Sequence, residues 1–258
     1  LSSTAISISN PLVQEESLLR TSLMPGQLKI ISYNQSHRIK KLKFFEIGHV
    51  YLPSEDDQLL PDEREHLSIS IAGGDATEIV AILDMISLTM AFPNMQLKQQ
   101  QIEGLHPGRS AQVVVAGQER GAVGEVDPRV LRNYGIDDSV AWLELDLGSI
   151  LAGPFGKKKY TSVSKYPSSD IDLAFEVPDD TSSASVAGCL RKAGGTYLKE
   201  VQLFDSYKAD GANEGVRSLA YSLRFQSDEG TLTDAEVSEL RSACISEVEQ
   251  KTNAKLRE

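Results

Sequence analysis

The 258-residue sequence is poor in cysteine, in aromatic residues and in long apolar runs. Two cysteines are too few for a disulfide framework and are typical of a reducing compartment, so we expect a cytoplasmic location. No apolar run approaches the ~20 residues that a membrane-spanning helix needs. Residues 1–12 lack the basic and apolar regions of a secretory signal. The sequence therefore predicts no membrane association.

Positive charge is also scarce. The chain has 26 Lys and Arg against 37 Asp and Glu, for a net charge of −11. Residues 164–258 alone have 11 basic residues against 17 acidic ones, for a net charge of −6. A protein that holds nucleic acid through many phosphates is usually basic, because each contact releases counterions. If residues 164–258 bind RNA, we expect weak binding through a few nucleotides.

Patterns of catalytic and metal-binding residues are missing as well. The histidines have neither the spacing of a zinc site nor a glycine-flanked serine nearby; they are His37, His49, His66 and His106. Cys189 and Cys244 fall on the inward stripes of two expected helices, where a free thiol behaves as a small apolar group. We expect no catalytic residue and no metal ligand in this chain.

The clearest pattern lies in residues 164–258. Ile171, Leu173, Phe175 and Val177 alternate with polar or small residues, which predicts a half-buried strand. Apolar residues at helical spacing follow and end at Gly194-Gly195, and Leu219 to Phe225 alternates again. Thr233 and Glu236 form a capping box before a second apolar stripe. The predicted order is strand, helix, strand, strand, helix and short strand, a ferredoxin-like βαββαβ unit.

Residues 1–155 predict a largely antiparallel sheet with a few helices, so the fold class is α+β. We expect strands at 44–51, 67–71 and 141–147, and an apolar helix at 77–92. We also expect a hairpin of 111–117 and 121–126 with its turn at 117–121, and a short helix at 128–134. We expect a helix-prone segment at 15–34 to be broken by Pro25-Gly26. The acidic run 53–65 predicts a loop.

Several motifs, in one order, resemble the bacterial phenylalanyl-tRNA synthetase beta subunit. PSSDIDLAFEV (167–177), VQLFDSY (201–207), EGVRSLAYSLRF (214–225) and TLTDAEV (231–237) are similar to its ferredoxin-fold anticodon-binding domain. NPLVQEESLLRTSLMPGQL (10–28), FFEIGHVY (44–51) and GLHPGRSA (104–111) resemble its preceding catalytic-like domain. The resemblance implies a class II synthetase-like domain at 1–155, a linker at 156–163 and an anticodon-binding domain at 164–258. It also implies the C-terminal part of a subunit about three times longer.

The resemblance implies the function of the intact enzyme. That enzyme is an aminoacyl-tRNA synthetase, a ligase of protein biosynthesis that joins phenylalanine to tRNA(Phe) with ATP and Mg²⁺ in an α2β2 assembly. In it, residues 1–155 would support the alpha subunit without catalysis, and no cofactor would be bound by this part. Arg109 and Glu46 are the nearest candidates for an ATP site, and we expect structural roles for both.

The resemblance also implies tRNA-binding residues on the open face of the C-terminal sheet. The matching positions are Ala174, Asp205 and Ser218, with Arg224 and Lys208 as phosphate neighbours. The strand parity puts even-numbered residues of the first and third strands on this face, which is small and polar rather than aromatic. Asp205 has odd numbering, so its position there requires a bulge between Leu203 and Tyr207. Without the resemblance, the favoured interpretation is that Asp205 caps a turn and Ser218 is a solvated strand residue.

Two other functions fit the same residues. One is a scaffold whose two domains bind only proteins. The other is a regulatory module that binds an amino acid, because ferredoxin-like folds serve many functions.

Overall fold

The computed structural model describes residues 5–13, 17–54, 60–92, 95–153, 160, 163–207 and 215–257. The chain divides into two compact units, Leu1–Lys159 and Tyr160–Glu258. The division falls within the expected linker at 156–163, of which only residues 160 and 163 are described, so the limits of that linker stay a prediction. No helix in the described part of the chain is long and apolar enough to cross a membrane.

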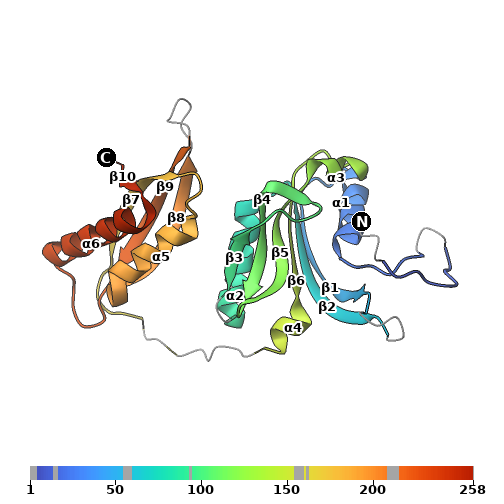
Figure 1. Cartoon of the computed structure of the whole chain (residues 1–258), viewed down its shortest axis with the longest axis horizontal. Coiled ribbons are helices and arrows are strands. Elements are labelled where there is room, and N and C mark those ends of the chain that lie inside the picture. Colours follow the sequence, from blue (N-terminus) through green and yellow to red (C-terminus); the bar gives the residue numbers. More distant parts are fainter. Residues whose placement is uncertain are drawn as a thin grey trace. The chain divides into compact units, whose positions relative to one another are not determined.

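The first unit is built on a six-stranded antiparallel sheet with the strand order β1-β2-β6-β5-β4-β3 (Figure 1). Its elements are α1 (Met24–Ser36), β1 (Leu42–Leu52), β2 (Asp62–Ala72), α2 (Ala76–Met90), β3 (Gln96–Gln99), β4 (Leu105–Val115), β5 (Gln118–Val126), α3 (Pro128–Asn133), β6 (Val140–Asp146) and α4 (Leu147–Leu151). The antiparallel sheet and the α+β class agree with the sequence.

Strand β6 runs through the middle of this sheet and is buried on both faces. Val140 and Trp142 pack into a core shared with α1 and α3. Ala141, Leu143 and Leu145 pack on the other face, in a core shared with α2. Successive strand residues point to opposite faces, which explains why the adjacent residues Val140 to Leu143 are all apolar. Glu144 and Asp146 continue the α1 side of β6, and they are buried there.

Three expectations for the first unit are wrong in detail. The hairpin turn is not at 117–121: β4 and β5 are joined by Ala116 and Gly117 alone, both with positive φ. Such two-residue turns match the twist of paired strands. Pro25-Gly26 does not break a helix, because Pro25 lies in the first turn of α1, where its missing N–H costs nothing. The acidic segment is not all loop, since β2 begins at Asp62.

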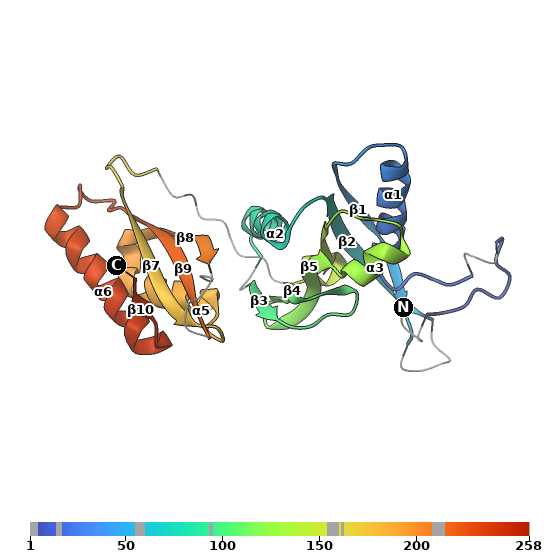
Figure 2. The same cartoon turned by 90° about the horizontal axis from the view of Figure 1, so that it is seen from above.

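The second unit has the predicted ferredoxin-like order. Its elements are β7 (Ser169–Pro178), α5 (Ser183–Gly194), a 3₁₀ turn (Gly195–Tyr197), β8 (Leu198–Tyr207), β9 (Val216–Phe225), α6 (Asp234–Thr252) and β10 (Lys255–Leu256). The sheet is antiparallel with the order β10-β7-β9-β8. Both helices cover one face of it, and the other face is open (Figure 2).

The core of the second unit lies between this sheet and its helices. Leu173, Phe175 and Val177 of β7 are buried there, as the alternation predicts. The expected capping box is present: Thr233 accepts from the Glu236 backbone, and the Glu236 carboxylate accepts from the Thr233 backbone. The start of α6 is therefore set by local sequence, and no helix in the described part of the chain covers the opposite face of the sheet.

Candidate functional site

The open face of the second sheet carries four rows of side chains that run across the strands. Opposite residues on antiparallel strands share a face, so the strand register defines each row. From one end of the sheet to the other, the rows on β7, β9 and β8 are Asp170–Arg224–Glu200, Asp172–Ser222–Gln202, Ala174–Ala220–Asp205 and Glu176–Ser218–Tyr207. We call the third of these the alanine row.

The alanine row brings two of the expected site residues together. Ala174 lies opposite Ala220, and Ala220 lies opposite Asp205. Two methyl side chains thus leave a low strip with a carboxylate at its β8 end. Ser218 lies two residues from Ala220 on the same strand, so its hydroxyl borders this strip.

Asp205 reaches the open face because β8 has an extra residue. Leu203 lies opposite Tyr221 and Asp205 lies opposite Ala220, so Phe204 is inserted between them. The insertion reverses the parity of the strand beyond it. The bulge that Asp205 requires is therefore present at the expected place.

The same bulge turns Tyr207 to the open face, opposite Ser218. Tyr207 is 49% exposed. The expectation of a face without aromatic residues is wrong on β8, because the parity count was made only for the first and third strands. Once a bulge is inferred for Asp205, the same inference applies to Tyr207, so this residue was within reach of sequence reasoning.

Of the two expected phosphate neighbours, Arg224 and Lys208, the structure describes only Arg224. Arg224 donates to both oxygens of Asp170, and its Nη1 lies 3.1 Å from Glu200 Oε2. The hydrogen bond from Arg224 lowers the pKa of the Asp170 carboxyl below its ordinary value. Arg224 is therefore already neutralised by two carboxylates at one end of the face. Lys208 lies outside the described residues.

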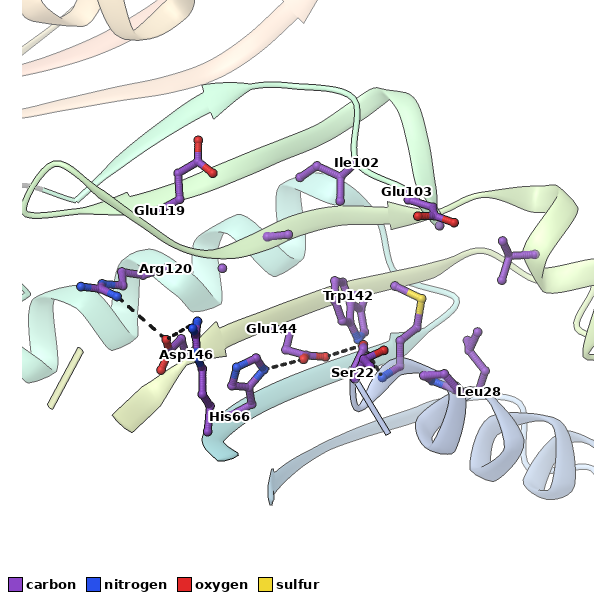
Figure 3. A pocket seen from close by; sticks show the side chains of 18 of the residues that line it. Ser22, Leu28, His66, Ile102, Glu103, Glu119, Arg120, Trp142, Glu144 and Asp146 are labelled. Atoms are coloured by element: carbon purple, nitrogen blue, oxygen red, sulfur yellow. Dashed lines mark hydrogen bonds and ion pairs between the residues drawn. The ribbon is translucent and has the colours of Figure 1, made fainter. Parts of the chain in front are cut away.

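The first unit contains a cavity of about 560 Å³ on the α1 side of its sheet (Figure 3). Met24, Leu28 and Ile102 line it from α1 and from the loop before β4, and Trp142 lines it from β6. Its polar end contains Arg64, His66, Arg120, Glu144 and Asp146. A cavity of this size can accept a small ligand. Whether that ligand could be a nucleotide depends on whether its charged side chains are available to bind phosphates.

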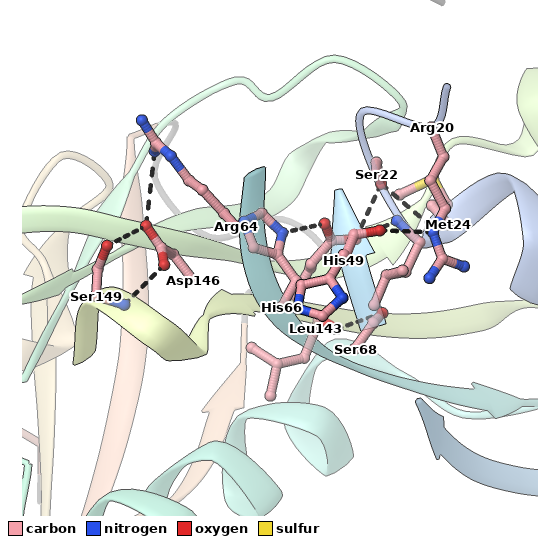
Figure 4. Close-up of polar contacts among 12 residues, drawn as sticks. Arg20, Ser22, Met24, His49, Arg64, His66, Ser68, Leu143, Asp146 and Ser149 are labelled. Atoms are coloured by element: carbon pink, nitrogen blue, oxygen red, sulfur yellow. Dashed lines mark hydrogen bonds and ion pairs between the residues drawn. The ribbon is translucent and has the colours of Figure 1, made fainter. Parts of the chain in front are cut away.

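Glu144 is the centre of the polar contacts at this end. Its Oε2 accepts from the Ser22 hydroxyl and the Leu23 backbone N–H, and its Oε1 lies 2.7 Å from His66 Nδ1. These contacts tie the start of α1 to β2 and β6 across the sheet (Figures 3 and 4). Sequence reasoning missed this pair, because His66 and Glu144 are far apart in the chain and their register follows only from the sheet.

The two arginines of the cavity are turned toward carboxylates. Arg64 binds Asp62 Oδ2 at 2.5 Å and lies 3.6 Å from Asp146 Oδ2, and Arg120 lies 3.9 Å from the same oxygen. Asp146 also accepts from the Ser149 hydroxyl and backbone (Figure 4). A triphosphate would have to displace these carboxylates. This arrangement does not fit an ATP clamp.

The carboxylates do not form a Mg²⁺ site either. Glu144 and Asp146 are occupied by protein donors, and the described residues contain no group of three or more metal-binding side chains. The two sequence candidates for an ATP site are also engaged. Arg109 pairs with Glu125 at 2.9 Å, and Glu46 pairs with Arg20 at 2.8 Å. We therefore derive no catalytic step from this unit.

Two family models cover most of the chain. Residues 2–147 match the model of the phenylalanyl tRNA synthetase beta chain CLM domain, which is more than half of the chain. Residues 164–257 match the ferredoxin-fold anticodon binding domain. The chain belongs to the phenylalanine–tRNA ligase beta subunit family.

Relatives of this family align along nearly all of the chain. A phenylalanine–tRNA ligase beta subunit from Clostridium tetani is 34% identical over 254 residues, which is 98% of this chain and 32% of the relative. One from Symbiobacterium thermophilum is 31% identical, over 90% of this chain and 27% of the relative. The chain thus spans about a third of the length of the curated relatives it matches.

A solved pyrrolysyl-tRNA synthetase from Desulfitobacterium hafniense also matches in structure. It covers 58% of this chain and 52% of its own, with 18% identity and a TM-score of 0.44. A likeness at this level carries no argument about fold or function.

All residues of the open face lie within residues 164–257, the segment that matches the anticodon binding domain model. The structure brings Ala174, Asp205 and Ser218 together there. Arg224 lies two rows away from the alanine row, where it forms ion pairs with Asp170 and Glu200. The roles of all five expected residues toward RNA stay predictions.

Proposed function

We propose that this chain acts within a phenylalanine–tRNA ligase, which joins phenylalanine to tRNA(Phe) with ATP and Mg²⁺ in an α2β2 assembly in the cytoplasm. In this proposal the second unit docks the anticodon region of the tRNA. The first unit supports the alpha subunit and takes no part in the chemistry. ATP and Mg²⁺ are bound elsewhere in the assembly, because the arginines and carboxylates of the cavity satisfy one another.

The alanine row is the observation that carries the docking proposal. Ala174 and Ala220 let a base approach the sheet closely, and Asp205 presents acceptors to the N–H groups on the edge of a guanine. Ser218 and Tyr207 border the row with a hydroxyl and an aromatic ring. Aromatic stacking and edge recognition of unpaired bases are how proteins read single-stranded RNA.

The acidic charge of the unit is compatible with this role. Recognition through one or two base edges needs few cations, whereas phosphate-driven binding needs many. The proposal therefore predicts recognition that depends on the assembled enzyme, in which other parts of the assembly hold most of the tRNA.

Aminoacylation by the enzyme assembled with its alpha subunit tests the docking. We expect Asp205→Asn to raise the KM for tRNA(Phe) about ten-fold, since a good edge contact contributes roughly 1–3 kcal/mol. Ala174→Leu fills the low strip without changing charge and should raise the same KM. The matched controls are Glu239→Gln and Ala235→Leu on the exposed side of α6, which should leave it unchanged. Unchanged kinetics for both face variants would favour the scaffold.

An exposed apolar surface on the α2 side of the first sheet supports the alpha-subunit proposal. Phe45 and Ile47 of β1 are 67% and 51% exposed. They lie opposite Ile69 and Leu67, which pack against the α2 core, so both point to that face. Met85 and Leu88 of α2 are also exposed, at 59% and 78%. These four exposed apolar side chains lie on the same side of the sheet, and exposed apolar surface of this kind is typical of protein interfaces.

Complex formation tests this surface directly. We expect Leu88→Glu to weaken association with the alpha subunit in size-exclusion chromatography, because a charge would be buried at the interface. Ile30→Glu is the matched control, since Ile30 is an exposed apolar residue of α1 on the other face of the sheet. Equal effects of the two variants, or none, would remove this role from the α2 face.

A further inference from the structure

We propose that Arg257 completes the alanine row at the β10 edge and binds an RNA phosphate there. This inference rests on the proposed docking of the anticodon region. It adds a residue outside the set that the sequence singled out.

The backbone places Arg257 in the row. Lys255 lies opposite Glu176 and Leu256 lies opposite Phe175. The next N–H, that of Arg257, donates to the Ala174 carbonyl at 2.8 Å, so Arg257 continues the register opposite Ala174. Leu256 faces the core, and therefore its neighbours Lys255 and Arg257 face the open side.

This edge is held firmly despite the shortness of β10. The Leu256 N–H donates to Glu249 Oε1 at 3.1 Å, and Ala254 is buried. Asn253 ends α6 in the left-handed conformation and turns the chain back onto the sheet. Arg257 is thus presented from an anchored backbone, as a site residue must be.

The completed row has a cation at one end and a carboxylate at the other. It reads Arg257, Ala174, Ala220 and Asp205 across four adjacent strands. Three strand spacings separate its ends, about 14 Å between backbones. A nucleotide whose base edge meets Asp205 directs its sugar and phosphate away from that carboxylate. Across the two alanines, that direction leads to Arg257.

Charge on the face favours the same end. The four rows have five carboxylates, those of Asp170, Asp172, Glu176, Glu200 and Asp205. Arg224 is engaged by two of them, whereas in the described part of the chain Lys255 and Arg257 have no ion-pair partner. Lys255 stands beside Glu176, which offsets its charge. Arg257 stands beside an alanine instead of a carboxylate, so its charge is available to a polyanion.

The salt dependence of tRNA binding tests the inference in the enzyme assembled with its alpha subunit. The logarithm of the tRNA association constant falls linearly with the logarithm of the salt concentration. Loss of one phosphate contact should make this slope less steep by about 0.7. We expect Arg257→Gln to show this reduced slope and about a three- to ten-fold higher Kd for tRNA(Phe) at low salt. Arg257→Lys should keep most of the affinity, because a lysine also binds a phosphate as a point charge.

Arg241→Gln is the matched control, because Arg241 is an exposed arginine of α6 on the covered side of the sheet. Equal slopes for Arg257→Gln and Arg241→Gln would overturn the inference. A changed preference among anticodon bases with an unchanged slope would also overturn it, since that result belongs to a base contact. If Asp205→Asn still impairs binding in either case, the docking proposal stands and only the role of Arg257 is lost.

Discussion

At the scale of single residues, Asp127 couples the stability of the first unit to pH. Its carboxylate caps α3 by accepting from the Arg129 backbone, and it also binds the Arg129 guanidinium. These hydrogen bonds lower the pKa of Asp127 from 3.8 to about 2. A lowered folded-state pKa gives stability that is complete above pH 4 and is lost as the pH falls toward 2.

We therefore expect Asp127→Asn to lower the urea midpoint of the first unit at pH 5 and to have a much smaller effect near pH 2. The asparagine keeps the cap acceptor, so the difference isolates the ionised carboxylate. Tryptophan fluorescence measures this, since the only tryptophan, Trp142, is buried in that unit. An equal loss at both pH values would contradict the ion-pair explanation.

The two cysteines should differ in reactivity. Cys244 is fully buried in the core of the second unit, and burial raises the pKa of its thiol to about 11. At pH 8 only roughly one thousandth of such a thiol is ionised. Cys189 is partly exposed, and burial raises its pKa as well. We expect iodoacetamide to label Cys189 well before Cys244, as peptide mass spectrometry would show, and equal rates would mean that the helical layer opens readily.

At the scale of elements, the turn between β4 and β5 stores strain. Ala116 has a φ of 52°, a conformation that alanine adopts at a cost and asparagine accepts more readily. We expect Ala116→Asn to stabilise the first unit by about 0.5–1 kcal/mol, because Asn-Gly is the preferred sequence of this turn. Ala116→Val should have the opposite sign. Urea unfolding followed by Trp142 fluorescence compares the two variants.

The same turn marks a limit of sequence reasoning. The strands of the second unit were predictable because Leu173, Phe175 and Val177 alternate, and α6 because Thr233 and Glu236 form a cap. Ala116 carries no turn signal, and the paired strands impose its conformation. The short strand β3 was missed, since four residues hold too little of a pattern against β4.

The candidate site shows the same division. Asp205 was placed through a bulge that parity and resemblance required together. Arg257 was not singled out, because only the pairing of Lys255 and Leu256 with β7 places it beside Ala174. The same holds for Arg64 and Arg120, because their pairing with Asp146 follows only from the folded sheet.

At the scale of the whole molecule, the chain has separate cores in its two units. Val248→Ala opens a space in the core of the second unit. We expect it to lower the free energy of unfolding of that unit by about 2 kcal/mol. Trp142 fluorescence should report an unchanged transition for the first unit. Far-ultraviolet circular dichroism should show that the second unit unfolds at a lower urea concentration. A shift of both signals together would mean that the units unfold as one.

The irregular shape of β8 also affects how copies of the protein behave toward one another. This strand is an edge of its sheet, and a regular edge offers a ladder of unpaired backbone groups that another chain can extend. Two register shifts, after Leu198 and after Leu203, interrupt that ladder. The residue that turns Asp205 outward therefore also protects the edge against intermolecular strand pairing, and regularising β8 would favour aggregation.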